Sequence, residues 1–213
     1  MDKFTTLTSH AIPLPQADID TDAILPAQFL LRLDRALGRY AFHAARHGKD
    51  PFVLEQPKYQ GAQILVAGPR FGIGSSREHA IWALHDLGLR VLIAPSFGEI
   101  FQANAVRNGL LPINLGGETH ARLLAAADAG TPITVDLQAC TLTIEGEAPI
   151  AFPVAAHDRE TLLEGLDETA RILSQHGAAI AAHEARQAAE TPWLDLTTAQ
   201  LAPFPTPSES TAA

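Results

Sequence analysis

Cysteine is almost absent from this chain, which contains only Cys140 among its 213 residues. One cysteine cannot form an intrachain disulfide, and it cannot by itself hold a structural zinc ion or an iron–sulfur cluster. Any such cluster must therefore come from another chain. Long apolar runs are missing too, and the first residues lack the charged and then apolar pattern of a signal peptide. We therefore expect a cytoplasmic protein without a membrane span.

Basic residues are also scarce, because 15 Lys and Arg residues stand against 24 Asp and Glu, which gives a formal charge of −9. This balance argues against nucleic acid and against an anionic membrane as partners. The segment from Pro26 to Lys49 is an exception, with five cations and one acid. It is either a solvated basic face or a surface that attracts an acidic small molecule or an acidic partner.

Hydrophobic residues make up 46% of the chain, which is enough to fill the core of one large domain. Buried-strand patterns alternate with helical patterns, which predicts an α/β fold with a partly parallel central sheet flanked by helices. We expect one domain over residues 1–190 and a Pro/Ser/Thr-rich, disordered tail over residues 191–213. The expected strands are 9–15, 64–67, 90–95, 110–115, 133–137, 141–144 and 150–154, and the expected helices are 76–87, 97–107, 118–129 and 159–187, the last with a break near Gly177.

The stretch Phe-Gly-Ile-Gly-Ser-Ser-Arg-Glu-His-Ala, residues 71–80, joins a predicted strand to a predicted helix. Its two glycines allow positive φ and a close approach of the backbone. Ser75, with Glu78 three residues later, has the pattern of a capping box, and Gly88 is a suitable C-terminal cap. Ser96 is expected to cap the next helix in the same way.

An anion is favoured at a helix start, and Arg77 adds a planar, two-pronged donor for a carboxylate or a phosphate. The stretch is therefore either an ordinary capped helix or an anion-binding site. A Walker-type phosphate loop is excluded because no Gly-Lys-Ser/Thr follows Gly74, and the third glycine of a dinucleotide fingerprint would fall at Arg77. No glycine closes a nucleophile elbow. What remains is a hydroxyl beside an arginine, which suits proton abstraction next to a carboxylate.

Two candidate metal sites fail on spacing. The alternating aspartates of residues 18–22 lack the glycine and the glutamate of a calcium loop. His43 and His47 lack the catalytic glutamate of a zinc-protease helix. Asp20 and Asp22 are instead expected to be turn and N-cap residues. They precede two predicted core residues, Ile24 and Leu25, and a short helix that begins at Pro26.

Residues 71–80, with 20–26, 94–97, 108–112 and 165–167, resemble the small-subunit family of 3-isopropylmalate dehydratase, which matches the swivelling C-terminal domain of the aconitase superfamily. The resemblance runs in order from about residue 4 to 188. It implies a swivelling β/β/α domain. It also implies that this chain holds no metal and that its partner is a large subunit with a [4Fe–4S] cluster.

The activity that the resemblance implies is a hydro-lyase step of leucine biosynthesis. The heteromer would interconvert 2- and 3-isopropylmalate, a small dicarboxylate substrate, by removing and re-adding water. The cluster iron would hold the departing hydroxyl as a Lewis acid. Two alternatives remain open: the small subunit of a related hydro-lyase, of the homoaconitase or citraconate/methylmalate type, and a non-catalytic anion-binding module.

The resemblance also implies roles for individual residues. Ser75 inherits the role of the base that takes the proton, while Ser76 and Arg77 inherit contacts to the substrate carboxylate, with Gly74 beside them. The segment after Pro26 resembles the family's substrate-selecting helix and loop. Its candidate substrate-binding residues are Leu30, Leu31 and Arg32. The two leucines either line an isopropyl pocket or are simply core residues.

Overall fold

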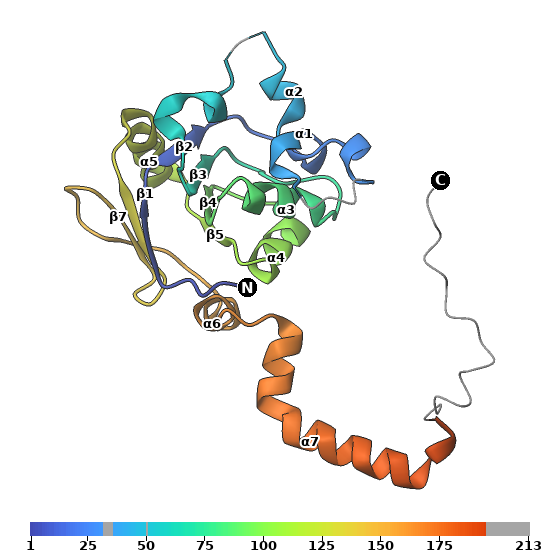
Figure 1. Ribbon diagram of the computed structural model, residues 1–213. Helices are drawn as coiled ribbons and strands as arrows, with labels where there is room; N and C mark the ends of the chain where they lie inside the picture. The colour runs from blue at the N-terminus through green and yellow to red at the C-terminus, as the bar shows by residue number, and fades with distance from the viewer. Residues whose placement is uncertain (32–35, 50, 195–213) are drawn as a thin grey trace. The chain divides into compact units, whose positions relative to one another are not determined.

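The computed structural model describes residues 1–31, 36–49 and 51–194 (Figure 1). The chain divides into two compact units, Met1–Glu168 and Thr169–Ala213, and the first contains all the strands of the described residues. The second contains most of the helix α7 (Glu168–Glu190), which has no buried residue, and a 3-10 turn at Pro192–Leu194. The predicted domain boundary at residue 190 stays a prediction, and most of the predicted tail lies outside the described residues.

A parallel sheet forms the centre of the first unit (Figure 1). Its strands are β2 (Ala11–Leu14), β3 (Ile64–Ala67), β4 (Val91–Ala94) and β5 (Leu111–Asn114), in that spatial order. Every pair is parallel, which confirms the pairing that the alternating strands and helices predicted. β2, which contains Pro13, lies at an edge as expected, because proline has no N–H group and would leave the ladder of an inner strand without one hydrogen bond.

The two inner strands are buried at every position, as in parallel sheets that are covered on both faces. Side chains alternate between the faces. Leu65 packs in a cluster with Ile81 of the helix α3 (His79–Asp86), whereas Ile64 packs with Leu123 of the helix α5 (Gly117–Ala129) and with a second sheet. The first unit thus has two cores, one on each face of the parallel sheet.

The second sheet is antiparallel and has four strands. They are β1 (Thr6–Ser9), β6 (Ile133–Asp136), β7 (Thr141–Ile144) and β8 (Ile150–Ala151), in that order. β6 and β7 alternate between buried and half-buried residues, which is typical of a sheet with one covered face. This confirms the predicted hairpin, the predicted edge strand and the β/β/α fold. β1 was not predicted, because its threonines and serine form no apolar run.

The remaining helices are short. They are α1 (Thr21–Ile24), α2 (His43–Arg46), α4 (Glu99–Arg107) and α6 (Ala156–Glu164). 3-10 turns occupy Ala27–Phe29, Gly38–Tyr40, Val53–Glu55 and Pro57–Tyr59. Across the described part of the chain, no helix has both the length and the apolar character needed to cross a membrane.

The break in the C-terminal helical region lies at Gly165, not near Gly177 as predicted. Gly165 has φ of +67° and ends α6, and a β-carbon there would lie 2.8 Å from the carbonyl oxygen of Met1. Gly177 lies inside α7. A glycine within a helix costs only about 1 kcal/mol, so glycine content alone does not identify the helix end.

The starts of α3 and α4 also differ from the prediction. Their N-cap residues are Glu78 and Gly98, and neither makes a side-chain capping bond, so the capping roles predicted for Ser75 and Ser96 were wrong. Both serines belong to loops that hydrogen-bond to other segments, and these bonds replace the caps. The predicted end of α3 is confirmed, because Gly88 has φ of +89° directly after the C-cap residue.

Candidate functional site

The site loop, residues 68–78, contains most of the predicted stretch 71–80 and follows β3 at the carboxyl edge of the parallel sheet. This edge is where open α/β sheets bind ligands. The loop continues the sheet's hydrogen bonding beyond the strands. The Gly72 amide donates to the carbonyl of Ile19 (2.7 Å) on one side, and the Phe71 amide donates to the carbonyl of Ser96 (3.1 Å) on the other. The segments that follow the two neighbouring strands, β2 and β4, therefore hold the loop in place.

Gly72 is the tightest point of the loop. Its φ is +73°, and a β-carbon there would lie 2.2 Å from Cγ of Phe101 in α4. The Phe101 ring packs edge-on against Phe71 (centroids 5.5 Å apart) and stacks with Phe97 (6.3 Å). Only glycine meets both requirements here, because an L side chain would be strained by the backbone and would collide with the ring.

Ser75 is held at its backbone by Thr21, the first residue of α1. The Ser75 amide donates to Oγ1 of Thr21 (3.2 Å), and that hydroxyl donates to the Ser75 carbonyl (3.3 Å). Thr21 is only 2% exposed, whereas Ser75 is half-buried. The residues that the structure describes offer no hydrogen-bond partner to Oγ of Ser75. The side chain that the resemblance names as the base is therefore available on a backbone that is fixed.

Ser76 and the start of α3 are held from the other side by α4. Asn104, which is buried, donates to the carbonyl of Ser76 (3.4 Å), and Asn108 donates to Oε1 of Glu78 (3.2 Å). Asn108 also accepts from the indole of Trp82 (3.0 Å). Glu78, the predicted second half of a capping box, is thus bound to a neighbouring helix.

Arg77 makes an ion pair with Asp22 of α1 at 2.5 Å. Both side chains are partly exposed, so the pair contributes little to stability. The ion pair instead fixes the direction of the Arg77 guanidinium, because it holds one Nη atom. A guanidinium has five N–H donors in all, so this pair does not use every donor. Asp22 thus has a role that the sequence analysis did not predict, while Asp20 caps α1 as predicted by accepting from the Ala23 amide.

The segment after Pro26 is partly described. Leu30 is half-buried and packs against the core, whereas Leu31 is 93% exposed, so Leu31 is not a core residue. Arg32 lies outside the described residues. Phe29, just before these residues, is buried and stacks on Tyr40 at 4.3 Å. Leu31 is therefore an exposed residue next to a turn that Phe29 anchors in the core, as a residue that lines a substrate pocket would be.

The basic character of residues 26–49 is also only partly described. Arg46 pairs with Glu55 (3.0 Å), and the guanidinium of Arg39 lies over the ring of Tyr40 (4.8 Å). Two further arginines of this segment, at positions 32 and 35, lie outside the described residues. The contacts of Arg46 and Arg39 show that at least these two cations serve the local structure.

Metal ligands do not gather in the part of the chain that the structure describes, where no group of three His, Cys, Asp or Glu residues is placed to hold an ion. The rings of His43 and His47 pack at 4.0 Å instead. The donor set does not fit a [4Fe–4S] cluster, since such clusters need several thiolates and the chain has one cysteine. Cys140 lies just before β7, in the antiparallel sheet region.

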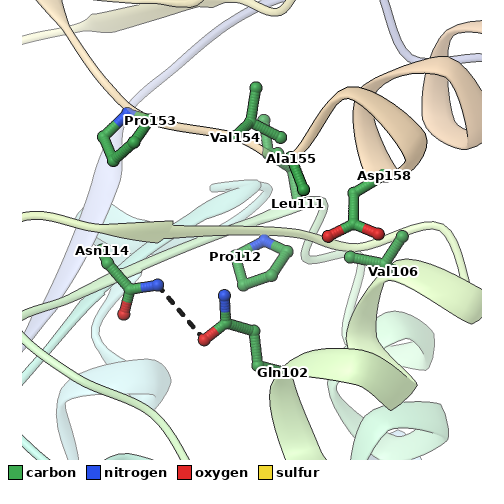
Figure 2. Close-up of a pocket in the computed structure, with 9 residues that line it drawn as sticks. All are labelled: Gln102, Val106, Leu111, Pro112, Asn114, Pro153, Val154, Ala155 and Asp158. Carbon is green, nitrogen blue, oxygen red and sulfur yellow. Dashed lines mark hydrogen bonds between the residues drawn. The ribbon is translucent and has the colours of Figure 1, made fainter. Parts of the chain in front are cut away.

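A pocket of about 370 Å³ lies elsewhere, between β5, α4 and the segment before α6 (Figure 2). Figure 2 shows the Asn114 side chain donating a hydrogen bond to Gln102 (3.2 Å), with Asp158 across from them. None of the predicted substrate-binding residues that the structure describes lines this pocket. The residues whose chemistry suits a diacid thus lie on the open carboxyl edge of the sheet, not in this cavity.

Sequence reasoning missed three residues that hold the site loop, namely Thr21, Asn104 and Asn108. Thr21 stands between the two aspartates that were singled out, and the asparagines are four residues apart at the end of α4. A polar residue within an otherwise apolar helix face was the available signal for Asn104, which is buried among Phe101 and Ala105. No local pattern identifies the partner of such a residue.

Comparisons with known proteins identify the family of this chain. Residues 1–118 match the family of the aconitase C-terminal domain, and residues 175–197 match the family of the C-terminal domain of the 3-isopropylmalate dehydratase small subunit. Proteins named 3-isopropylmalate dehydratase small subunit from Paramagnetospirillum magneticum and Neisseria gonorrhoeae are 45% and 44% identical. The alignments cover 91% of this chain in both cases, and 100% and 99% of those proteins.

A solved structure shows the same fold. The crystal structure of 3-isopropylmalate dehydratase from Methanocaldococcus jannaschii superposes with a TM-score of 0.61 at 25% identity, covering 84% of this chain and 99% of that one. The resemblance found in the motifs is thus confirmed over most of the chain. The chain belongs to the family of 3-isopropylmalate dehydratase small subunits.

Proposed function

We propose that this chain is the small subunit of 3-isopropylmalate dehydratase, the hydro-lyase of leucine biosynthesis that interconverts 2- and 3-isopropylmalate. It works with a large subunit that carries the [4Fe–4S] cluster. The observation that carries the proposal is the loop from Gly72 to Arg77, in which a half-buried serine lies beside an arginine on a backbone held from two sides. The relatives named as small subunits, which align over nearly their full length, support it.

The residues of this chain perform the proton transfer and the carboxylate binding. Oγ of Ser75, as an alkoxide, takes the proton from the carbon adjacent to the one that bears the hydroxyl, and a carbon–carbon double bond forms as hydroxide leaves. Ser76 and Arg77 bind the carboxylate, and Gly74 leaves room for it. Hydroxide then adds to the carbon that lost the proton, while the Ser75 hydroxyl returns its proton to the carbon that lost the hydroxyl. Lewis-acid chemistry at the departing hydroxyl is supplied by the cluster of the partner, since the single cysteine of this chain cannot hold one.

The proposal also covers the part of the site that receives the isopropyl group, the partners of the protein and its location. Leu31, exposed on a turn anchored by Phe29, lines the part of the site that receives the isopropyl group. Leu30 and Arg32 are the other substrate-binding candidates of this segment of the sequence. The formal charge of −9 argues against nucleic acid and an anionic membrane surface as partners. A biosynthetic role of this kind supports a cytoplasmic location for the complex.

The test of this function is an assay of the heteromer, prepared anaerobically by co-expression with a cluster-bearing large subunit. We expect turnover of 2- and 3-isopropylmalate, and much weaker turnover of homoaconitate, citraconate and methylmalate. A preference for one of these other diacids would identify a related hydro-lyase instead. A complex that binds diacids without turning over any of them would establish the alternative of a non-catalytic anion-binding module.

Replacement of Arg77 by lysine is expected to raise the KM for isopropylmalate by roughly tenfold, with a smaller change in kcat. The physical reason is that a point charge replaces a planar fork that binds a carboxylate through two parallel hydrogen bonds. Steady-state kinetics of the heteromer measure the changes in KM and kcat. Arg122, which pairs with Glu147 far from the site loop, provides the matched control as Arg122→Lys, with unchanged constants expected. An unchanged KM for Arg77→Lys would contradict contact with the carboxylate.

A further inference from the structure

The hydroxyl of Thr21 occupies an unusual place for a side chain of a four-residue helix. It accepts from the amide of Ser75 and donates to the carbonyl of the same residue, so that both polar backbone groups of Ser75 end on one oxygen. These bonds join residues 54 positions apart in the sequence. Because Thr21 is 2% exposed, water does not readily replace them.

The backbone of Thr21 adds a third connection. Its amide donates to the carbonyl of Ile73 (2.9 Å), so Thr21 bonds the loop on both sides of Gly74. Gly74 has φ of +95°, and a β-carbon there would lie 3.5 Å from Cβ of Asp20 and 3.7 Å from Oγ1 of Thr21. The loop therefore turns directly against α1, and its turn is closed by Thr21.

The position of α1 is itself fixed. Asp20 caps the helix through the Ala23 amide, and Ile24 and Leu25 at its end are fully buried in the core. The Phe42 amide also donates to the carbonyl of Ile24 (2.7 Å). Thr21 thus connects the backbone of Ser75 to a rigid part of the core, and it leaves Oγ of Ser75 out of these bonds.

We propose that Thr21 is a positioning residue for this site: its hydroxyl sets the backbone of Ser75 so that Oγ points at the substrate carbon. The inference rests on the proposed function, in which Ser75 is the base. It differs from the roles of Ser76 and Arg77, because Thr21 acts through the backbone of Ser75 and not on the carboxylate. Its loss should therefore act on kcat and leave substrate binding almost unchanged.

The test compares Thr21→Val with Thr21→Ser in the assembled heteromer. Valine keeps the shape of the side chain and removes the hydroxyl. It is expected to lower kcat by about 10- to 100-fold, the scale of a misplacement of the catalytic group by about 1 Å. KM is expected to stay within about twofold. Serine keeps the hydroxyl and is expected to restore most of kcat. Thr161→Val, at a buried threonine of α6 away from the loop, is the control and should keep normal kinetics.

Several outcomes would overturn the inference. A normal kcat for Thr21→Val, with a large loss for Ser75→Ala in the same preparation, would show that Ser75 is the base but needs no positioning by Thr21. An equal rise in KM for both valine variants would indicate general loosening of the fold. If serine fails to restore kcat although the complex assembles, the hydroxyl is not the active part of Thr21. Failure of the proposed function is distinguishable, since the unmodified complex would then not turn over isopropylmalate.

Discussion

Replacement of Ser75 by alanine is expected to lower kcat of the assembled complex by roughly two to four orders of magnitude, the range that a positioned acid–base group supplies. The change removes one oxygen atom that has no hydrogen-bond partner among the described residues, so no bond of the described fold is lost. The backbone bonds of Ser75 to Thr21 do not depend on its side chain. Folding, assembly and binding should therefore remain normal. Assays of isopropylmalate turnover measure the loss of kcat, and size-exclusion chromatography of the complex measures its assembly.

Ser76→Ala is the matched control for that experiment. It removes a hydroxyl from the next residue, whose backbone is held by Asn104, and is expected to raise KM more than it lowers kcat. The contrast between the two serines separates proton transfer from carboxylate binding. Near-normal turnover of Ser75→Ala would remove Ser75 from the role of base, and a larger kcat loss at Ser76 would exchange the two assignments.

The parallel sheet was predictable from sequence because its strands carry their own signal. The runs at 64–67 and 91–94 are apolar at every position, and such a pattern between helices is typical of a strand covered on both faces. The hairpin of β6 and β7 was predictable for the opposite reason, since its alternation reports one covered face. β1 has neither signal, and it is a strand because β6 pairs with it.

The helix starts were not predictable from local pattern. A serine followed three residues later by a glutamate satisfies the capping-box rule, but the rule assumes that the two residues have only each other to bond. Here the amide of Ser75 has Thr21 as its partner and the carboxylate of Glu78 has Asn108. Tertiary hydrogen bonds replaced the local ones, and the helix begins at His79.

The candidate site divides in the same way. The chemical types of residues 74–77 could be chosen from the sequence, because the motif and the family resemblance both point to them. What the sequence could not provide is how that loop is held, since Thr21 and Asn104 approach it from segments more than 25 residues away. The family resemblance identifies the reacting residues, whereas the structure identifies the residues that support them.

Gly72→Ala is expected to destabilise the first unit by about 2–5 kcal/mol. The estimate combines about 1–2 kcal/mol for a left-handed backbone with a β-carbon and about 1–3 kcal/mol for forcing atoms into a packed site. The colliding atom is Cγ of Phe101, near the base of its side chain, and the ring is 3% exposed between Phe71 and Phe97. It therefore has no free direction in which to move. Urea unfolding followed by circular dichroism measures the change.

Gly146→Ala separates the two contributions. Gly146 has φ of +85° in the turn after β7, and a β-carbon there would meet nothing within 4 Å, so only the backbone contribution of about 1–2 kcal/mol applies. A double-mutant cycle with Phe101→Leu tests the steric contribution directly. The smaller side chain should reduce the loss of stability that Gly72→Ala causes by collision with the ring. Equal losses at Gly72 and Gly146, with no coupling to Phe101, would contradict the close packing of the loop on α4. A large, coupled loss at Gly72 would mean that the ring fixes the backbone three residues before Ser75, so that the core of the domain and the geometry of its proposed base depend on the same contact.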